Sequence, residues 1–450
     1  MRVLKFGGTS MGDEYTWQKV FNIIKQYDHP YIIVSATSRT TRQLLAAAEK
    51  TLNNPEDAKL ITDDIHNRHY AIITKFLSSV GESDSDIAAN CQNWIDERMH
   101  ELNSLLTKIH NAHKCNPAVE DAVASIGERL SSYLFAQCGK ALGLPTQWVD
   151  AAKIIRTDSN FGKALPDEDF INQAALELWN NKTNTHIPVM GGYYGKDTKG
   201  NFTTLGFEGS DYTASLIGAA LSADAIEIWT DVSGIYTCDP RTVPDAQPIP
   251  NLSFQEATEL AYFGAKVLHP STTKPASQKK IPVYVKNIFD SEQPGTRISH
   301  ETTNDHRIKA MAFKENCVIL TVTSSNTVMG YEFLAGVFET LHRHHMPVDV
   351  VTTTEASVSI TTENDKGLDE AIDKLCDYGS VELSSGLGII SLVGCKPKKT
   401  QNLIQDVMST IQTSYINLIS YSESKGNLNI VLEKTDIIPS VIAIHNELFR

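Results

Sequence analysis

The sequence has few cysteines, no long apolar stretch and no apolar leader. Its seven cysteines are odd in number, scattered and never spaced as a CxxC pair, which argues against a disulfide framework or a thiolate zinc site. No apolar run approaches the roughly 18 residues of a membrane-spanning helix, and Met1–Lys5 leads directly into Phe6-Gly7-Gly8 without the apolar segment of a signal peptide. We therefore expect a cytoplasmic protein in a reducing compartment, with no membrane partner.

The sequence also lacks an excess of basic residues and the common phosphate-loop motifs. Fifty-four acidic residues against 40 basic ones give a formal net charge of −14, so nucleic acid is not an expected partner. Neither GxxxxGK[ST] nor GxGxxG occurs anywhere in the chain. Any phosphate site must therefore be built from a different glycine-rich turn.

The features that are present indicate an α/β protein of several domains. The 450 residues correspond to about three domains at roughly 150 residues each. Short apolar segments that end at glycine-rich or hydroxyl-rich turns occur at Arg2–Phe6, Tyr31–Val34, Ile187–Met190 and Ala225–Trp229. Apolar strands that alternate with helices predict a mainly parallel sheet covered on both faces. Ligands of such sheets bind beyond the carboxyl ends of the strands.

The polar segment Asp290–His306 marks the end of this first domain. After it, the order strand-helix-strand-strand-helix occurs twice, over Cys317–Leu375 and over Gly388–Leu448. Each repeat of about 65–75 residues resembles a small ferredoxin-like module. We therefore expect three domains, at residues 1–300, 308–385 and 386–450.

Two glycine-rich segments are candidate phosphate or substrate loops. Lys5-Phe6-Gly7-Gly8-Thr9-Ser10 follows the first strand, where glycine N–H groups, a helix N-terminus and a lysine together suit a phosphate. Gly206–Asp211 precedes an apolar helix, and Ser210 or Asp211 could simply cap that helix. Each segment alone is compatible with an ordinary tight turn, so neither assigns a function.

Five motifs in order resemble those of the aspartate kinases in the amino-acid-kinase superfamily. They are KFGGTS at 5–10, SIGERLS at 125–131, GSDYTA at 209–214, WTDV at 229–232 leading to DPR at 239–241, and FGAKVLHP at 263–270. The two repeats after residue 308 resemble the paired ACT regulatory domains of the same enzymes, so the resemblance covers essentially the whole chain. It implies an amino-acid-kinase fold, with a mainly parallel sheet sandwiched by helices, followed by two ferredoxin-like ACT domains.

The resemblance also implies a reaction and a role for each matching position. The reaction is ATP plus L-aspartate giving ADP plus 4-phospho-L-aspartate, with Mg²⁺ on the phosphates, the first step towards lysine, threonine and methionine. The catalytic residues would be Lys5, Asp211 and Lys266. The ATP-binding residues would be Gly7, Gly8, Thr9, Ser10, Thr230, Asp231, Tyr236, Arg241 and Val267. The aspartate-binding residues would be Ser35, Thr41, Glu128, Phe207, Gly209 and Ser210, with Glu128 placed to take the ammonium group.

The chemistry of this reaction agrees with the residues available. A carboxylate has a pKa of about 4 and is already an ionised nucleophile at neutral pH, so no catalytic base is needed. Phosphoryl transfer then depends on in-line positioning and on neutralising oxygen charge. Lys5 and Lys266 supply positive charge, and Asp211 can orient them. We expect ATP oxygens and water to hold most of the Mg²⁺ coordination, because this ion dehydrates reluctantly, and we expect no protein-built metal site.

Phe207 departs from the pattern of the family. Relatives usually carry an arginine two residues before Gly209, where it forks onto the α-carboxylate of aspartate, and phenylalanine cannot make that contact. Arg39 and Arg42, in the loop that contains Thr41, are candidate replacements, although a solvated loop explains both at least as well.

This departure leaves two alternatives to an aspartate kinase open. One is a kinase for another small carboxylate or carbamate, and the other is an amino-acid sensor with weakened catalysis. The retention of Lys5, Glu128, Asp211 and Lys266, together with the ACT pair, favours the aspartate kinase.

The regulatory half also departs from the best-known pattern. In lysine-inhibited relatives a Met-x-His stretch precedes the helix that begins Phe-Leu-Ala, whereas residues 327–330 here read Thr-Val-Met-Gly. The implied effector-contacting residues are Met329, Phe333, Leu334, Val348, Asp349, Thr353, Thr354 and Glu355. We expect an amino-acid effector, with lysine and threonine as the first candidates, and a homodimer or dimer of dimers formed through the ACT domains.

Overall fold

The computed structural model forms two compact units. It describes residues 1–83, 85–182, 186–264, 272–300, 308–324, 330–363, 367–394, 403–411, 414–422 and 426–449. The first unit comprises Met1–Ile235, Pro250–Phe254 and Leu268–Thr302. The second comprises Tyr236–Ile249, Gln255–Val267 and Thr303–Arg450. The second unit therefore includes two short segments that come before residue 300.

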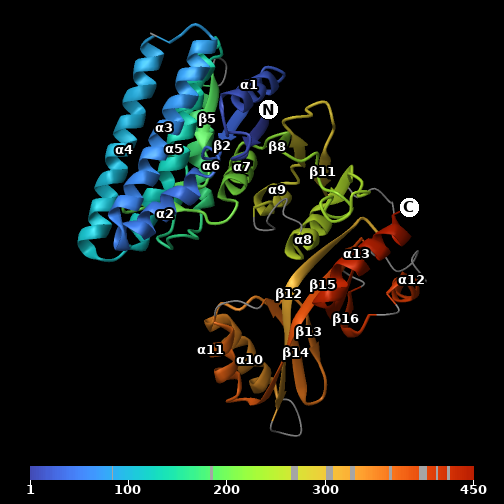
Figure 1. Cartoon of the computed structure of the whole chain (residues 1–450). Coiled ribbons are helices and arrows are strands. Elements are labelled where there is room, and N and C mark those ends of the chain that lie inside the picture. Colours follow the sequence, from blue (N-terminus) through green and yellow to red (C-terminus); the bar gives the residue numbers. More distant parts are fainter. Residues whose placement is uncertain are drawn as a thin grey trace. The chain divides into compact units, whose positions relative to one another are not determined.

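A mainly parallel sheet forms the centre of the first unit (Figure 1). In spatial order its strands are β3 (Thr146–Val149), β5 (Ile187–Gly191), β2 (Tyr31–Val34), β1 (Arg2–Phe6), β8 (Ala225–Thr230), β10 (Val283–Asn287), β11 (Thr296–Ser299) and β9 (Asn251–Ser253). Only the β10–β11 pair is antiparallel. Every residue of β2 and β5 is buried, as continuous apolar strands between two helical layers require. The predicted parallel sheet is confirmed.

Helices cover this sheet and extend into a bundle. They are α1 (Glu14–Ile24), α2 (Thr40–Asn53), α3 (Pro55–Ser79), α4 (Asp86–Ala112), α5 (Pro117–Ala141), α6 (Glu168–Lys182), α7 (Gly209–Ala220) and α9 (Lys274–Gln278). Helix α8 (Phe254–Tyr262) belongs, after its first residue, to the second unit. Side chains of Asn54, Ser85 and Asn116 cap α3, α4 and α5 by accepting backbone N–H groups. Figure 1 shows α2 to α5 packed side by side.

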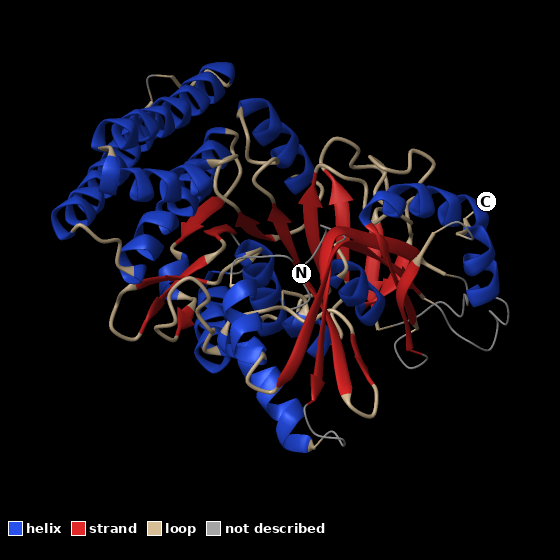
Figure 2. Ribbon diagram, turned by 60° about the horizontal axis from the view of Figure 1, so that its bottom comes forward, coloured by secondary structure: helices blue, strands red, loops and turns tan. Residues whose placement is uncertain are grey.

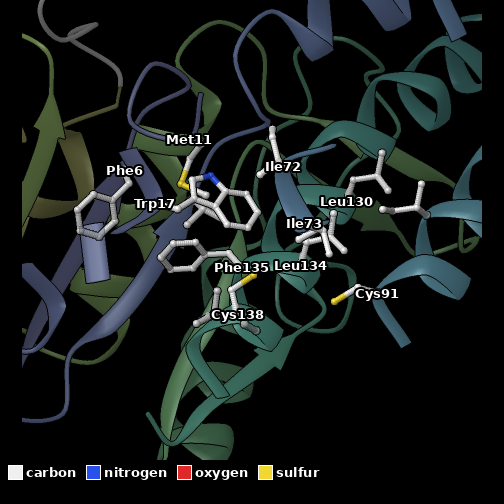
Figure 3. Packing of buried hydrophobic residues seen from close by; sticks show 14 of the residues in the cluster. Phe6, Met11, Trp17, Ile72, Ile73, Cys91, Leu130, Leu134, Phe135 and Cys138 are labelled. Carbon is white, nitrogen blue, oxygen red and sulfur yellow. The ribbon is translucent and has the colours of Figure 1, made fainter. Parts of the chain in front are cut away.

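An aromatic cluster joins α1, α3 and α5 beneath the sheet. The rings of Phe21 and Phe135 stack with centroids 4.1 Å apart, and Trp17 meets Phe135 edge-on at 5.3 Å. Figure 3 shows Trp17 and Phe135 among the aliphatic side chains that surround them. Burying each large side chain contributes about 1.5–3 kcal/mol, so this cluster anchors the helix that carries the SIGERLS motif.

A small sheet that periodicity did not indicate lies beside α5. Its strands, in the order β4 (Arg156–Thr157), β6 (Tyr194–Asp197) and β7 (Phe202–Thr204), follow the short 3₁₀ helix Ala151–Lys153. Buried Asp121 of α5 accepts hydrogen bonds from the N–H groups of Gly162 and Thr204 and from the Thr204 hydroxyl. These bonds fasten the segment between β4 and α6, and the strand β7, to α5.

The second unit contains one six-stranded antiparallel sheet in the order β13-β14-β12-β15-β17-β16. Its elements are β12 (Ala310–Ser324), α10 (Tyr331–Arg343), β13 (Val351–Thr353), β14 (Ser357–Glu363), α11 (Leu368–Leu375), β15 (Gly379–Val393), α12 (Leu403–Thr410), β16 (Ile416–Ser422), β17 (Asn427–Glu433) and α13 (Lys434–Leu448). The order strand-helix-strand-strand-helix thus occurs twice, in agreement with the repeat seen in the sequence.

The two longest strands, β12 and β15, run through both repeats (Figures 1 and 2). The stretch 310–314 of β12 pairs with 389–393 of β15, and 317–324 pairs with 379–387. The side chains form two cores, one around Val318 and Leu375 and the other around Ile390 and Ile444. One continuous sheet therefore supports two hydrophobic cores.

Candidate functional site

A cavity of about 710 Å³ lies beyond the carboxyl ends of β1, β2 and β5, where ligands of parallel sheets bind. Nine residues predicted for catalysis, phosphate binding or substrate binding line it: Lys5, Gly8, Ser35, Thr41, Glu128, Phe207, Gly209, Ser210 and Asp211. The other lining residues are Ala36, Thr37, Arg39, Arg42, Gly162, Tyr193, Gly206 and Glu208. The fold thus brings together motifs separated by up to about two hundred positions.

A buried ion pair forms one part of the cavity wall. Lys5 Nζ, at the end of β1, lies 2.8 Å from Oδ1 of Asp211 in the first turn of α7. Both residues are less than a tenth exposed, so water screens this pair weakly. The carboxylate orients the ammonium group and keeps its charge at the cavity surface, as a site for phosphate oxygens requires.

Glu128 supplies the opposite charge on the cavity wall. Its side chain is buried on α5, and Oε1 accepts a hydrogen bond of 3.2 Å from the Ala36 N–H. Its other oxygen, Oε2, has no hydrogen-bond partner among the described residues. Burial raises the pKa of Glu128 to about 8, against the opposing effects of the Ala36 bond and the charge of Lys5. A buried carboxylate with an unused oxygen fits an ammonium group of a ligand.

The turn after β1 is held by the neighbouring strand β8. The Gly7 N–H and the Ser10 hydroxyl both donate to the Trp229 carbonyl, at 3.1 and 3.2 Å. Ser10 is fully buried, whereas Thr9 is exposed and Gly8 lines the cavity. Gly7 and Ser10 therefore hold the turn in shape, whereas Lys5 and Gly8 of this motif line the cavity.

Two glycines at the end of β5 allow α5 and the first turn of α7 to approach this strand. A Cβ on Gly192 would lie 2.6 Å from Ser210 Cα, and one on Gly191 would lie 2.9 Å from the Glu128 carbonyl oxygen. Real Cβ atoms do not come this close to other atoms. Glycine at both positions is what lets α5 and α7 meet at the strand end.

Buried His69 of α3 fixes the loop that follows β2, and sequence reasoning missed it. Its Nδ1 lies 2.7 Å from the Ile65 carbonyl, and its Nε2 lies 3.0 Å from the Thr37 hydroxyl. Because a carbonyl can only accept, Nδ1 carries the proton and Nε2 accepts from Thr37. Burial lowers the pKa of His69 to about 4, so the ring stays neutral. Only the pairing across 32 positions would have revealed this role, and spacing gives no such signal.

Tyr193 is a second lining residue without a sequence signal. Its backbone has φ 71°, an uncommon conformation for a residue with a side chain, and its N–H donates to the Thr213 hydroxyl at 3.1 Å. It follows the two glycines at the end of β5, so the strained turn carries Tyr193 into the cavity wall.

The predicted nucleotide-binding residues are distributed over both units. Thr230 ends β8, and its hydroxyl lies 3.1 Å from Asp231 Oδ1. Tyr236 and Arg241 belong to the second unit, where Arg241 forms an ion pair with Asp239 at 2.6 Å. Lys266 and Val267 lie outside the described residues. The assignment of an ATP subsite to these positions stays a prediction.

The predicted effector positions have different surroundings in the second unit. Phe333 packs in the core of the first repeat, and Leu334 and Val348 are partly buried. Thr353, Thr354 and Glu355 are exposed at the turn between β13 and β14. Met329 lies outside the described residues.

Asp349, another predicted effector position, is already paired within the chain. Its carboxylate is 1% exposed, and its Oδ1 lies 2.9 Å from Lys314 Nζ. Lys314 also lies 2.9 Å from Glu363. The hydroxyl of Tyr262, at the end of α8, donates a hydrogen bond to the Val348 carbonyl beside this pair. An effector ammonium group that reached Asp349 would therefore share it with Lys314.

No described helix combines the length and apolar character needed to cross a membrane. No group of three or more His, Cys, Asp or Glu side chains among these residues is arranged to hold a metal ion.

Comparisons with known proteins give the same relatives by sequence and by structure. Lysine-sensitive aspartokinase 3 of Escherichia coli K12 is 34% identical over 100% of this chain and 99% of its own length. Chloroplastic aspartokinase 2 of Arabidopsis thaliana is 31% identical over 100% of this chain and 84% of its own. The crystal structure of E. coli aspartokinase III with aspartate and ADP (R-state) matches with a TM-score of 0.87 at 33% identity, covering all of both chains.

The same E. coli enzyme with lysine and aspartate (T-state) matches with a TM-score of 0.80, again over all of both chains. The sequence profile described as the amino acid kinase family matches residues 1–287. That region contains Lys5, Glu128 and Asp211 and therefore the whole cavity wall. The chain belongs to the amino acid kinase family.

Proposed function

We propose that the cavity binds L-aspartate and presents its side-chain carboxylate to the γ-phosphate of ATP. The protein is an aspartate kinase, as its full-length relatives are. One observation carries the assignment of the site: an unpaired oxygen of Glu128 and the Lys5–Asp211 ion pair share one cavity. The first suits the ammonium group of an amino acid, and the second suits a phosphate.

The proposed reaction needs no proton transfer. An oxygen of the aspartate β-carboxylate attacks the γ-phosphorus, and the bond from that phosphorus to the β,γ-bridging oxygen breaks, so the electron pair leaves on ADP. Lys5 neutralises charge on the transferring phosphoryl group, and Asp211 holds the Lys5 ammonium in place. The Gly8 backbone lets phosphate oxygens approach closely. Glu128 holds the substrate ammonium and thereby sets the direction of the β-carboxylate.

The donor set of the cavity fits a hydrated Mg²⁺ that enters with ATP. No cluster of three metal-ligating side chains occurs among the described residues, and Asp211 is the wall carboxylate beside the phosphate-directed lysine. Mg²⁺ prefers phosphate and water oxygens with one or two carboxylates. When bound, it would neutralise the β- and γ-phosphates, with Asp211 as its protein contact.

An ADP-release assay with hydroxylamine trapping tests this function. Hydroxylamine converts an acyl phosphate into a hydroxamate, so aspartate plus ATP should give aspartyl hydroxamate and ADP in equal amounts. Hydroxamate formed only with another small acid would move the assignment to that acid. ADP and hydroxamate absent with every acid would favour a non-catalytic amino-acid sensor.

Regulation, assembly and location follow as further parts of the proposal. The two repeats after residue 308 would bind lysine or threonine and inhibit the kinase, and the chain would form homodimers through them. The free, scattered cysteines support a cytoplasmic location. Aspartyl hydroxamate formation measured with saturating lysine, threonine or both tests the effector, and light scattering tests the dimer. Full activity under all three conditions would contradict regulation by these amino acids.

A further inference from the structure

We propose that Arg39 binds the α-carboxylate of aspartate and so takes the place of the arginine that is absent at position 207. This inference rests on the proposed aspartate site and names the residue that selects an α-amino acid. An α-amino acid carries its ammonium and carboxylate groups on one carbon atom. A cavity that recognises both therefore needs a negative and a positive group within reach of each other.

The cavity offers Arg39 as a cation without a partner. Of the cationic side chains in its wall, Lys5 is committed to Asp211, whereas neither Arg39 nor Arg42 forms an ion pair with any residue that the structure describes. The same wall contains Glu128 with its unpartnered, fully buried oxygen. The negative group for the ammonium and a free guanidinium for the carboxylate are thus both present.

The backbone at Arg39 indicates that its side chain is needed. Arg39 immediately precedes α2 and has φ 67°, a left-handed conformation that glycine adopts without strain and arginine does not. Its side chain makes no capping hydrogen bond to α2, although this position normally favours a serine or an aspartate for that purpose. The helix therefore gains nothing from an arginine here, while a ligand does.

The loop that carries Arg39 is fixed from three directions. The Ala36 N–H is bound to Glu128, and Thr37 is bound to His69. Arg68 donates to the Thr40 hydroxyl at 3.0 Å. A loop held in this way loses little entropy when a ligand arrives.

Arg68 adds positive charge to the surroundings of Arg39. Burial lowers the pKa of the Arg68 guanidinium, the Asp64 carboxylate 4.0 Å away raises it, and the charge of Arg39 lowers it. An anion bound to Arg39 would offset this repulsion. The dipole of α2 acts on Arg39 at its N-cap and on Arg42 in its first turn alike, so separate variants of the two residues distinguish them.

Position 207 cannot supply the missing contact. Phe207 is 81% exposed in the turn before α7 and lines the same cavity. Its phenyl ring has no hydrogen-bond donor. The cavity thus has an arginine on the β2–α2 loop and an apolar ring on the loop before α7, and both loops border the same space.

The decisive measurement compares aspartate with β-alanine, which keeps the ammonium and the reacting carboxylate but lacks the α-carboxylate. Arg39→Gly and Arg39→Ala should raise the aspartate KM about 10–150-fold, the effect of losing a hydrogen bond to a charged group. The ATP KM and the inhibition constant of β-alanine should stay within twofold. Lys59→Ala, which removes an exposed charge from α3, is the control and should change none of these values.

Two further measurements separate recognition from folding. Arg39→Gly relieves the left-handed strain, so its melting temperature should equal or exceed that of the parent while aspartate binding is lost. A purely structural role would lower stability instead. Phe207→Arg combined with Arg39→Gly should restore the aspartate KM to within a few fold of the parent.

Each remaining outcome overturns the inference. Arg39 does not have this role if the aspartate KM is unchanged in Arg39→Gly. The same holds if the inhibition constant of β-alanine rises as much as the aspartate KM, or if only Arg42→Ala raises the aspartate KM. A parent enzyme that forms no aspartyl hydroxamate would instead refute the proposed function, and that result is visible before any variant is made.

Discussion

In the proposed site, Glu128 should make aspartate binding depend on pH. Its pKa of about 8 in the free cavity means that the carboxyl group is mostly protonated at pH 7, whereas an ammonium ligand needs it ionised. The proton must therefore leave on binding, and the aspartate KM should fall about tenfold per pH unit between pH 6 and 7 and level off above pH 8. A pH profile of kcat/KM measures this. Succinate, which lacks the ammonium group, should inhibit with no such dependence.

Glu128→Gln separates this binding effect from folding. The raised pKa means that the folded state favours the protonated carboxyl, so its contribution to stability declines as the pH rises from the ordinary value of 4.5 towards 8. Glutamine has no proton to lose and should raise the melting temperature at pH 8 or above while it abolishes the pH dependence of aspartate binding. A variant that is both less stable and still pH-dependent would contradict this role.

Lys5 should act on the rate more than on nucleotide binding. Its charge is held against Asp211 at the cavity wall and matters most as charge develops on the transferring group. Lys5→Ala should lower kcat by about 10²–10³, the usual effect of losing one donor to a transition state, and change the ATP KM only a few fold. Steady-state kinetics of ADP release provide the test, and turnover within a few fold of the parent would exclude Lys5 as the catalytic lysine.

The loop between β2 and α2 depends on α3 for its shape, because His69 of α3 accepts a hydrogen bond from the Thr37 hydroxyl. His69→Phe should leave that hydroxyl buried without a partner and lower stability by about 1–3 kcal/mol. The aspartate KM should rise while the ATP KM changes little. Urea unfolding and kinetics measure the two effects, and Asp63→Ala on the exposed side of the same helix is the control.

Adding Thr37→Val tests the mechanism of that loss. Removing both polar partners should recover most of the stability, because the cost comes from one unpaired group. If the double variant is no more stable than His69→Phe, the hydrogen bond is not what holds the loop.

Elements and residues that depend on local sequence could be predicted, and those that depend on distant pairing could not. Apolar segments located β1, β2 and the two repeats, and the resemblance located Lys5, Glu128 and Asp211 on the cavity wall. Asp121 gave no signal, because its partner Thr204 lies 83 positions away. The pairing of β12 with β15 was equally hidden, since the alternation of apolar and polar residues indicates the two faces of a strand but not its neighbouring strands.

The assignment of residues to units shows the same limit for the whole molecule. Residues 236–249 follow the WTDV motif directly, yet they belong to the second unit, where the Thr237 hydroxyl lies 2.9 Å from His445 Nε2. The composition does not change at residue 236, so nothing in the sequence indicates that the chain passes into the second unit there. Sequence order alone therefore does not assign residues 236–249 and 255–267 to the second unit, and the domain boundary at Asp290–His306 stays a prediction.

The pairing of β12 with β15 along both repeats also predicts how the repeats unfold. A fragment of residues 308–385 would lack the partner strand of 310–314 and should not form a stable domain. Circular dichroism of this fragment should show no cooperative melting, whereas the complete 308–450 segment should melt in one transition. A fragment that melts cooperatively by itself would show that the first repeat is autonomous.

The same strand pair has a consequence during synthesis. A ribosome releases the chain from the N-terminus, so residues 310–314 emerge about eighty positions before the partners at 389–393 that complete their ladder. Until then the backbone N–H and C=O groups on that side of β12 form an open edge, which is where chains pair with one another incorrectly. We therefore expect the half-made second unit to be an aggregation-prone stage of synthesis, and a chaperone that covers this edge to raise the yield of folded protein.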